Sequence, residues 1–585
     1  MQTYQVNIYD RNYTSWELYN LESNSTTEKA ELLNPLTNKL FDGDTIEIVD
    51  NHVTKVSGLN NNHQLEGVLI LEGNKTFGRT PNKKRLYYRC IPNNKNYPVF
   101  LVPYDVKLGF SKHQQNKYVL FKYDNWNSKH PYGELVEVLG DVDNLEVFYE
   151  YQLHCKKLHT SIKKLTNQTT TSLKNVPIIE NILQNSNYQI EDRTNEFVFS
   201  IDPDGSKDFD DAFSIEKQDD IYKVSIYIAN VYIWMEELNL WEHLTERVST
   251  IYLPDRKRPM LPLILSDSLC SLQENELRIA LAMDIYFDKN GNLLDNREIS
   301  YKNVVVKTRK NFVYEEKKLL KNSNYKEMMN LTKLLKPTVQ DSHELVEYWM
   351  IRMNKEVGTS LKKKECGVFR QAIYKNDTNE TYAGLDDNTS RLIRSWNNTD
   401  CKYVLYDKDI VLRHDMMDVG EYVHITSPIR RMVDLLNQII LASSEQLVTV
   451  RSTNANHFLD KWLENITGLN TDMKTIRKVQ TECQLLERCT NNPDLLDNIH
   501  DCVLFGKTES HQGVYSYVVY LTNMNILTRI KTKEEYLDLS KHRCKLFVFS
   551  DEDNIKNKIK CELQELMLCM NPVSYTHLRA HETRH

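Results

Sequence analysis

The residues with the greatest capacity for chemistry form one acidic run, Asp202-Pro203-Asp204-Gly205-Ser206-Lys207-Asp208-Phe209-Asp210-Asp211. Proline and glycine disfavour a helix there, and the apolar segment 197–201 before the run predicts a strand that ends where the carboxylates begin. Carboxylates this close repel one another, which raises their pKa values unless a cation is present. Oxygen ligands at this density suit Mg²⁺, or Mn²⁺ in its place, rather than Zn²⁺. The alternative is a solvated acidic turn.

An EF-hand calcium loop is excluded by two positions in the same run. Lys207 occupies the place of the invariant glycine of that motif, and Phe213 occupies the place of its bidentate glutamate.

Further motifs follow the acidic run in a fixed order: Tyr252-Leu253-Pro254, Met260-Leu261-Pro262, Leu269-Cys270-Ser271-Leu272, and Thr426-Ser427-Pro428-Ile429-Arg430-Arg431 with Asp434. Together with Ser200-Ile201-Asp202-Pro203 and Asp208–Ala212, they resemble the signatures of the RNase II/RNB exoribonucleases. The resemblance implies hydrolysis of single-stranded RNA from its 3′ end to nucleoside 5′-monophosphates. It also implies two Mg²⁺ ions about 4 Å apart.

The family pattern, carried over residue by residue, assigns metal ligation to Asp202, Asp208, Asp210 and Asp211, with Asp210 the carboxylate that matters most for chemistry. Arg430 is expected to contact the scissile phosphate through two donors, since a guanidinium suits this better than an ammonium. The alternative for Arg430 is a helix-start arginine that pairs with Asp434.

The resemblance also places four side chains near the RNA. Tyr252 and Tyr314 match tyrosines that hold the 3′-terminal nucleotides, where stacking tolerates any base. Glu347 matches a position near the terminal nucleotide, and Glu487 resembles another. The alternatives are core aromatic residues for the tyrosines and surface salt bridges for the glutamates.

Five positions depart from the family pattern. Asn230 and Tyr227 replace the aspartate and histidine of a His-Ile-Ala-Asp segment, Tyr348 replaces a glutamate, and Asn437 and Gln438 replace a His-Arg pair. None of these departures touches the four aspartates or Arg430. They bear on processivity and on the dependence on RNA length, not on the reaction.

The elements that must position these residues predict a multidomain α+β fold. Strands are expected at FVFSID, AFSIEKQ, YKVSIYIANV and ALAMDIYF, the last in a hairpin with the strand after Asn290-Gly291, and helices at 343–357, 427–444 and 473–489. Short strands separated by turn residues recur in the first third and again after 502, which is typical of small barrels. Phe41-Asp42-Gly43-Asp44 and Tyr132-Gly133-Glu134 resemble the cold-shock barrels of the family.

The predicted domains are a first cold-shock-like (OB-fold) barrel at 1–62, a second at 63–160, a linker at 161–195, a central α/β RNB catalytic domain at 196–500 and a C-terminal OB-type RNA-binding barrel at 501–572. The second barrel interleaves basic and aromatic residues at Lys83, Lys84, Arg85, Tyr87, Tyr88 and Arg89. Such a strand could offer stacking rings beside cations, or it could be an ordinary amphipathic strand. Segment 573–585 is expected to be a non-native tail; its histidines, four residues apart, could alternatively be imagined as a metal-binding face.

Composition limits the remaining choices. The chain has 585 residues, a net charge of −7, and 11 cysteines without a CxxC pair, which predicts reduced thiols. We expect a cytoplasmic monomer without a signal peptide or membrane span, and with no nuclease domain before the barrels. A DNA nuclease is disfavoured, because the family distinguishes RNA by its 2′-hydroxyl. The main alternative is an RNB-fold protein that binds RNA without cutting it.

Overall fold

The computed structural model describes residues 2–27, 33–49, 52–105, 114–174, 177–373, 385–386, 389–390, 392–393, 401–509, 513–551 and 556–564. The chain forms two compact units. One comprises Met1–Phe148, Glu380–Asn397 and Thr481–His585, and the other comprises Tyr149–Asn379 and Asn398–Gln480. The multidomain α+β prediction is confirmed.

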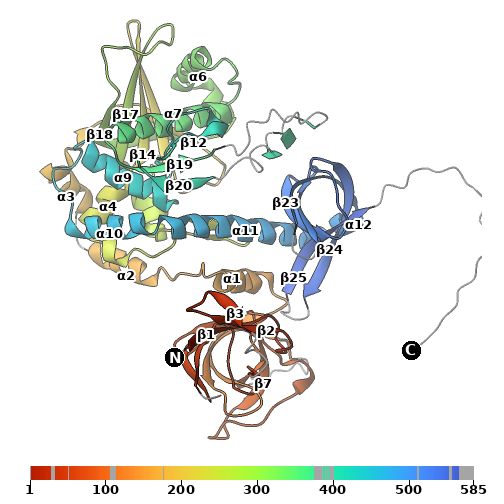
Figure 1. Cartoon of the computed structure of the whole chain (residues 1–585). Helices are drawn as coiled ribbons and strands as arrows, with labels where there is room; N and C mark the ends of the chain where they lie inside the picture. Colours follow the sequence, from red (N-terminus) through yellow and green to blue (C-terminus); the bar gives the residue numbers. More distant parts are fainter. Residues whose placement is uncertain are drawn as a thin grey trace, which may run out of the picture. The chain divides into compact units, whose positions relative to one another are not determined.

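The second unit is built on a six-stranded sheet with the order β11-β18-β12-β13-β14-β17, in which β17 also pairs with β18 (Figure 1). The strands are Glu191–Asp192 (β11), Val198–Asp202 (β12), Asp211–Gln218 (β13), Ile221–Ala229 (β14), Leu277–Asp288 (β17) and Ser300–Val313 (β18). Strands β14 and β17 are almost continuously buried, as expected when both faces of a strand are covered. The sheet therefore forms the rigid centre of this unit.

A buried ion pair ties the segment after β11 to the middle of β17. Arg193 donates two hydrogen bonds of 2.7 Å to Asp284, and Ser225 donates a third to the same carboxylate at 2.6 Å. Burial raises the pKa of Asp284, but the hydrogen bond and charge of Arg193 outweigh it and hold the pKa below 3.8. The carboxylate therefore stays charged at neutral pH.

Replacing Asp284 with asparagine is expected to lower the unfolding free energy of this unit by about 3 kcal/mol, because the buried Arg193 loses its two-bond carboxylate partner and keeps only the contacts of its Nε with Glu191 and Glu196. The folded-state pKa is lowered, so the contribution is present at neutral pH and is lost as the pH falls below about 4. Urea unfolding followed by tryptophan fluorescence at pH 7 and at pH 3.5 measures both effects. Equal midpoints for the variant and the parent at pH 7 would contradict the expectation.

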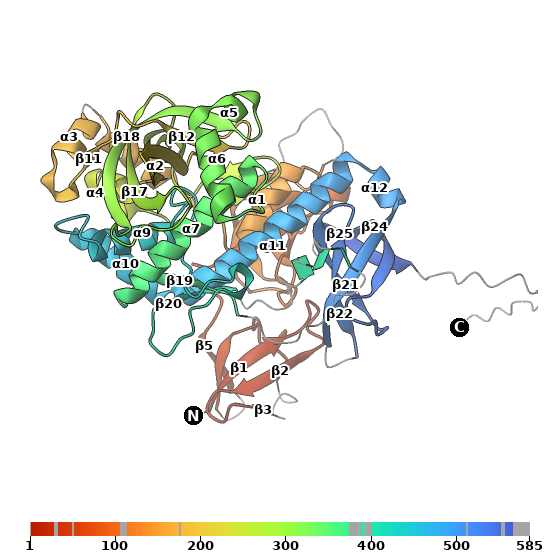
Figure 2. The same cartoon turned by 90° about the horizontal axis from the view of Figure 1, so that it is seen from above.

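Helices surround the sheet (Figures 1 and 2). The second unit contains Lys163–Ser172 (α2), Ile178–Gln184 (α3), Val231–Glu237 (α4), Lys317–Lys321 (α5), Ser323–Leu335 (α6), Ser342–Lys363 (α7), Met432–Ser444 (α9) and Thr453–Glu464 (α10), while Leu145–Cys155 (α1) and Ile466–Asn491 (α11) continue from one unit into the other. Trp349 of α7 packs edge-on against Phe287 of β17 at 6.0 Å between ring centroids. The three helices predicted from apolar spacing are present as α7, α9 and α11.

The segment predicted as a linker, 161–195, holds regular structure. It contains α2, α3 and β11, and β11 pairs in parallel with β18, so its end belongs to the six-stranded sheet. The predicted hairpin is confirmed, because β17 pairs antiparallel with β18, which follows Asn290-Gly291 and begins at Ser300. The positions of the domain boundaries otherwise stay predictions.

Three five-stranded sheets in the first unit share one strand order. When the five strands of each sheet are numbered 1 to 5 in chain order, their order across the sheet is 3-2-1-4-5 in all three sheets. In the second sheet, strand 5 also pairs with strand 3, and this pairing closes the barrel. This connectivity is that of the OB-fold. The strands are Gln2–Ile8, Trp16–Asn20, Ser25–Thr27, Thr45–Val49 and His52–Ser57 (β1–β5); Gln64–Leu69, Leu86–Pro92, Phe100–Tyr104, Lys117–Asn125 and Tyr132–Asp141 (β6–β10); and Ile499–Glu509, Tyr515–Leu521, Ile526–Thr532, Lys541–Asp551 and Lys556–Gln564 (β21–β25).

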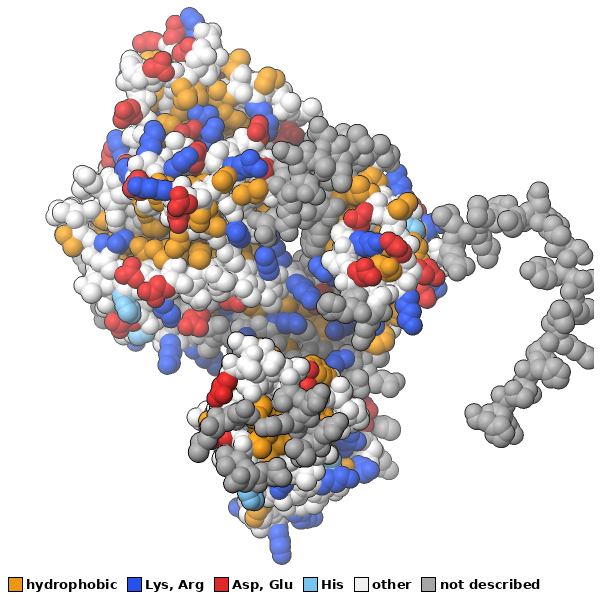
Figure 3. All heavy atoms as spheres, viewed as in Figure 1, with side chains coloured by type: hydrophobic (Ala, Val, Ile, Leu, Met, Phe, Trp, Pro, Cys, Tyr) orange, Lys and Arg blue, Asp and Glu red, His pale blue; other side chains and the backbone are white. Residues whose placement is uncertain are grey.

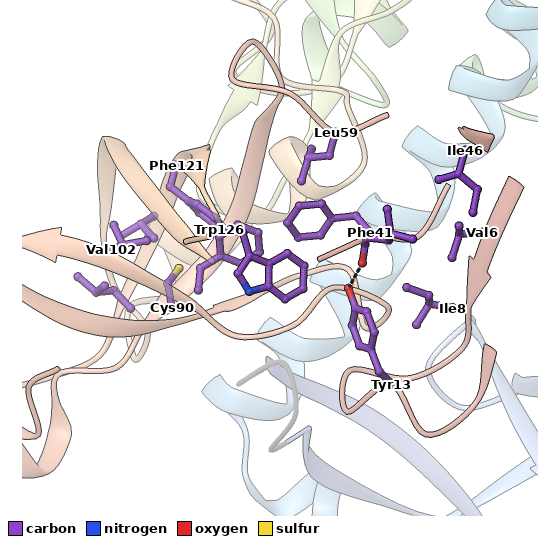
Figure 4. Packing of buried hydrophobic residues seen from close by; sticks show 14 of the residues in the cluster. Val6, Ile8, Tyr13, Phe41, Ile46, Leu59, Cys90, Val102, Phe121 and Trp126 are labelled. Carbon is purple, nitrogen blue, oxygen red and sulfur yellow. Dashed lines mark hydrogen bonds between the residues drawn. The ribbon is translucent and has the colours of Figure 1, made fainter. Parts of the chain in front are cut away.

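The first two sheets share a hydrophobic core (Figure 4). Phe41 stacks on Phe100 at 5.8 Å and lies 4.9 Å from Trp126, so the Phe41–Asp44 motif sits at the centre of this core. Asp44 of the same motif is buried and accepts hydrogen bonds from the backbone of Phe41 and Leu59. The motif therefore serves the packing of the barrels.

Three further expectations concerned the C-terminal tail, membrane spans and the distribution of surface charge. The segment 573–585 with its three histidines lies outside the described residues. None of the described helices is long and apolar enough to cross a bilayer. Basic and acidic side chains are interspersed over the face of the second unit seen in Figure 3, in keeping with the mixed overall charge.

Candidate active site

The acidic run forms the connection between β12 and β13, and a serine from a distant motif holds it. Ser271 accepts a hydrogen bond from the Phe209 backbone at 3.0 Å and donates one to the Lys207 carbonyl at 2.7 Å. The Leu272 backbone donates to the Phe209 carbonyl at 3.0 Å. The Leu269–Leu272 motif therefore fixes the backbone between Asp208 and Asp210.

Asp210 is the best-held carboxylate of the run. It is 3% exposed, accepts a hydrogen bond from the Ile429 backbone at 3.0 Å, and forms an ion pair with the Nε of Arg430 at 2.9 Å. Burial raises its pKa to about 6, even though Arg430 and Ile429 oppose the rise. The two strongest sequence motifs thus meet in one contact.

The suggested pairing of Arg430 with Asp434 is wrong, because the neighbouring arginine makes that contact. Arg431 donates to Asp434 at 2.8 Å, and the Ser427 backbone donates to the same oxygen at 2.7 Å. Arg430 instead donates from Nη2 to the Ser427 hydroxyl at 3.1 Å, and 44% of its side chain is exposed. Part of its guanidinium therefore faces solvent beside Asp210.

Asp202 and Asp211 repel each other, and the charge of Arg430 relieves this repulsion only in part. One oxygen of Asp202, Oδ2, is buried and has no hydrogen-bond partner among the described residues. Burial, with further contributions from Asp210 and Asp208, raises the pKa of Asp202 to about 7. Burial and the charges of Asp202 and Asp210 raise the pKa of Asp211 well above its ordinary value. A buried oxygen without a partner beside a second carboxylate fits a divalent cation.

The four carboxylates do not surround one point as they lie. Among the residues that the structure describes, no group of three or more His, Cys, Asp or Glu side chains is arranged to hold a metal ion. Asp210 is engaged with Arg430, and Asp208 with Lys257 at 3.2 Å. Ligation of metal by all four therefore stays a prediction.

Without metal, Asp202→Asn is expected to stabilise this unit at pH 8 by about 1–2 kcal/mol. The folded-state pKa of Asp202 is raised to about 7, so the parent loses stability as the pH rises from about 4 to about 7, and asparagine removes that loss. Thermal unfolding in chelator at pH 8 and pH 5 should show a larger gain at pH 8. An equal effect at the two pH values would contradict the expectation.

A short hairpin brings Tyr252 and Lys257 to the acidic run. Its strands, Ile251–Tyr252 (β15) and Lys257–Arg258 (β16), pair Tyr252 directly with Lys257. Tyr252 is 39% exposed; burial raises its pKa, the charge of Arg430 opposes the rise, and Asp208 and Asp210 add to it. The structure thus brings Tyr252 near both aspartates and Arg430. Sequence reasoning missed Lys257, although it lies inside a family-like segment.

The backbone before this hairpin is tied to the arginine motif. The Thr250 backbone donates to the Arg430 carbonyl at 2.9 Å, and the Met432 backbone donates to the Val248 carbonyl at 2.9 Å. Tyr252 and Arg430 are therefore positioned by one ladder of backbone bonds.

The second tyrosine is held by a ring that the sequence did not indicate. Tyr314 stacks on His343 at 3.8 Å, with an angle of 7° between the rings. Burial raises the pKa of Tyr314, with contributions from the charges of Asp211 and Asp202. Glu347 is exposed and lies one turn beyond His343 on α7, so the two share a helix face. Glu487 belongs to the other unit, and its substrate contact stays a prediction.

Four residues that depart from the family pattern, Asn230, Tyr227, Asn437 and Gln438, form hydrogen bonds within the unit. Gln438 binds the Tyr232 backbone and the Ala229 carbonyl, and Asn437 binds both backbone groups of Val368. Asn230 caps α4 and donates to Asn303 at 2.9 Å. The hydroxyl of Tyr227 bonds to Ser214 and Glu196.

A basic cluster lies next to Arg430. Burial lowers the pKa of His424 well below its ordinary value, and the charges of Arg431 and Arg370 lower it further. His424 bonds to the Tyr403 hydroxyl at 2.7 Å, and Arg370 lies over the Tyr403 ring at 4.9 Å. Guanidinium groups thus continue beyond Arg430 into the interior, where Arg370 is buried and Arg431 is paired with Asp434.

This geometry agrees with the matched protein families. Residues 190–336 and 317–446 match the RNB domain, and residues 87–151 match the Dis3-like cold-shock domain 2. The chain therefore carries an RNB domain at residues 190–446 and a Dis3-like cold-shock domain before it.

Its relatives include Ribonuclease R of Mycoplasmopsis pulmonis, 30% identical over 173 residues, which are 29% of this chain and 23% of that protein. Ribonuclease R of Aquifex aeolicus is 32% identical over 28% of this chain and 22% of its own length. DIS3-like exonuclease 2 of Schizosaccharomyces pombe is 27% identical over 40% of this chain and 26% of its own length. The matches thus span about a quarter of the length of these relatives.

Two solved structures share the fold over most of the chain. Mycoplasma genitalium RNase R, in complex with ribose methylated single-stranded RNA, has a TM-score of 0.66 at 16% identity and covers 95% of this chain and 99% of its own. Yeast Ssd1, a pseudonuclease, has a TM-score of 0.54 at 13% identity and covers 90% of this chain and 78% of its own.

Proposed function

We propose that this protein is a divalent-metal-dependent exoribonuclease that hydrolyses single-stranded RNA in the 3′→5′ direction and releases nucleoside 5′-monophosphates. The observation that carries the proposal is the contact of Asp210 with a half-exposed Arg430 beside two partly buried carboxylates, Asp202 and Asp211, whose mutual repulsion a cation would relieve. The RNB domain and the names of the relatives support the same reaction.

Arg430 has the chemistry to bind the scissile phosphate. Its Nε holds Asp210 and its Nη2 holds Ser427, so the guanidinium plane is fixed while 44% of the side chain remains exposed. A fixed fork of donors can stabilise charge that builds on the phosphate oxygens.

Asp202 and Asp211 are the carboxylates best suited to hold a metal ion, with Asp208 and Asp210 next to them. A bound divalent ion would supply an activated water and would neutralise charge on the phosphate. Asp208 already contacts Lys257 and Asp210 already contacts Arg430, so the presence of four carboxylates does not by itself determine how many ions bind.

Tyr252 and Tyr314 are proposed to hold the last bases of the strand. Tyr252 is near Arg430, and Tyr314 is near Asp211, so the two rings border the same carboxylates. Stacking contributes about 1–3 kcal/mol per base and does not depend on sequence. Such a site favours degradation of RNA ends of any sequence.

The experiment is to incubate the protein with 5′-labelled single-stranded RNA and Mg²⁺, with and without chelator, and to resolve the products. A ladder that shortens from the 3′ end, with 5′-monophosphates released, supports the proposal. Tight binding of RNA without cleavage would favour the alternative of an RNA-binding protein on an inactive RNB fold.

The second barrel is proposed to bind the RNA backbone. Lys83, Lys84 and Arg85 are exposed in the turn before β7, and the nearby Tyr87 and Tyr132 rings lie 5.0 Å apart. The triple alanine variant of these three cations should weaken RNA binding and reduce the salt slope by up to about 3. Anisotropy titrations at several salt concentrations measure both quantities. The control is Lys217→Ala with Lys289→Ala, which removes exposed lysines of the catalytic sheet; an equal change in this control would contradict the assignment.

A further inference from the structure

Lys257 places a permanent positive charge directly on the acidic run. Its ammonium group lies 3.2 Å from an oxygen of Asp208 and 3.0 Å from an oxygen of Asp267. Ser266 donates to the same oxygen of Asp267 at 2.6 Å. The ammonium group therefore sits between two carboxylates, and one of them belongs to the predicted metal site.

The hairpin that carries Lys257 does not depend on this contact for its position. The next residue, Arg258, bonds to Asp255 at 2.8 Å and to Glu150 at 2.7 Å. The acidic run has its own anchor in Ser271. The hairpin and the acidic run are thus each held in place by other contacts, and the Lys257–Asp208 contact is not needed to position either of them.

The charges of the site indicate what the contact does instead. When all four are ionised, as ligands of a metal ion would be, Asp202, Asp208, Asp210 and Asp211 carry four negative charges, and Arg430 and Lys257 contact two of these carboxylates. The remaining two, Asp202 and Asp211, match the charge of one divalent ion, and Asp202 still has a buried oxygen without a described partner. Asp267 adds a negative charge that holds the ammonium group in place.

We propose that Lys257 takes the place of one of the two divalent ions, so that this enzyme binds a single metal ion, at Asp202 and Asp211, while the lysine ammonium serves Asp208. This inference rests on the proposed metal-dependent function and specifies its metal requirement. An ammonium and a divalent ion cannot occupy the same position on Asp208, so removal of the lysine charge should open a second site.

The test is the number of Mn²⁺ ions bound per full-length chain, measured from the electron paramagnetic resonance signal of free Mn²⁺, without RNA and then with a ribose-methylated oligoribonucleotide. The parent should bind one ion, and Lys257→Met, which keeps the length of the side chain without its charge, should bind two. Lys257→Arg should bind one. The matched control is Lys302→Met, which removes a lysine that pairs with Glu191 at 2.6 Å outside the site and should leave one ion bound.

Asp208→Asn gives a second measurement that does not require Lys257→Met to fold. If the ion lies at Asp202 and Asp211, Asp208→Asn still binds one ion. Two ions in the parent, a single ion in a folded Lys257→Met, or loss of the ion in Asp208→Asn would each overturn the inference. Two ions in a parent whose RNA hydrolysis is abolished by chelator would overturn this inference alone, whereas chelator-resistant hydrolysis would overturn the metal-dependent function itself.

Discussion

Asp210→Asn is expected to lower the rate of RNA hydrolysis by about 10²–10⁴-fold while RNA affinity changes by no more than a few-fold. In the parent, one oxygen of Asp210 accepts the Ile429 backbone N–H and the other accepts the Nε of Arg430. Asparagine can keep the first bond, but its amide N–H then faces the Arg430 N–H. The variant therefore loses the charge at 210 and also releases Arg430 from its position.

Single-turnover cleavage of a short labelled RNA measures the rate, and fluorescence anisotropy measures affinity. Asp288→Asn is the matched control, because Asp288 is a half-buried residue at the end of β17 that accepts hydrogen bonds from Asn290 and Asn292 outside the site. Because Asp210 and Arg430 contact each other, their substitutions should combine with much less than additive effect. Hydrolysis by Asp210→Asn at the parental rate would remove Asp210 from the chemistry.

The strands around the site were predictable because their patterns are local. The apolar run before Asp202 and the alternation after Asp211 gave β12 and β13, and apolar spacing gave α7 and α9. The hairpin predicted on either side of Asn290-Gly291 is formed by β17 and β18, and β18 begins only at Ser300 because Asp288 wraps the turn. Its carboxylate accepts the backbone N–H of Asn290 and of Asn292, and the chain makes a short bridge from Phe287 to Leu293 before the strand begins.

In the segment 161–195, which was expected to be a linker, amino-acid composition did not reveal the secondary structure. Its run of threonine and asparagine suggests a solvated connection, yet 163–172 is helical. The hydroxyl groups of Thr166, Thr169 and Thr170 each donate to the carbonyl four residues earlier, so the polar side chains are satisfied within the helix. Leu165 and Thr169 are buried. Two buried positions four residues apart are too weak a pattern to reveal a helix.

The candidate site was predictable as a set of residues, but not as a set of contacts. Sequence motifs identified Asp210 and Arg430, whereas the roles of Ser271, His343 and Lys257 depend on segments that meet only in the folded chain. The two adjacent arginines illustrate the difference, since sequence spacing fits Asp434 equally well to either. In the folded chain the two side chains point in different directions, so Arg431 pairs with Asp434 and Arg430 pairs with Asp210.

Arg430→Lys is expected to lower the rate of hydrolysis by about 10²–10³-fold, with the binding of long RNA nearly unchanged. Arg430 performs two tasks at once, because Nε holds Asp210 and Nη2 holds Ser427 while the exposed part of the plane remains for a phosphate. A lysine ammonium is a compact, strongly hydrated point charge. It can stay beside the buried Asp210 or reach the phosphate, but it cannot present a fixed fork to both.

Single-turnover kinetics on a short labelled RNA measures the effect, and Arg431→Lys is the matched control. Arg431 bonds to Asp434 through one nitrogen at 2.8 Å, a contact that an ammonium can reproduce, so this control should lose much less activity. The same comparison at saturating RNA separates the rate from affinity, because a transition-state contact lowers kcat, whereas a contact made equally in the ground state raises KM. If Arg430→Lys cleaves within about three-fold of the parent, Arg430 serves only to hold Asp210, and the charge on the phosphate is stabilised by other groups.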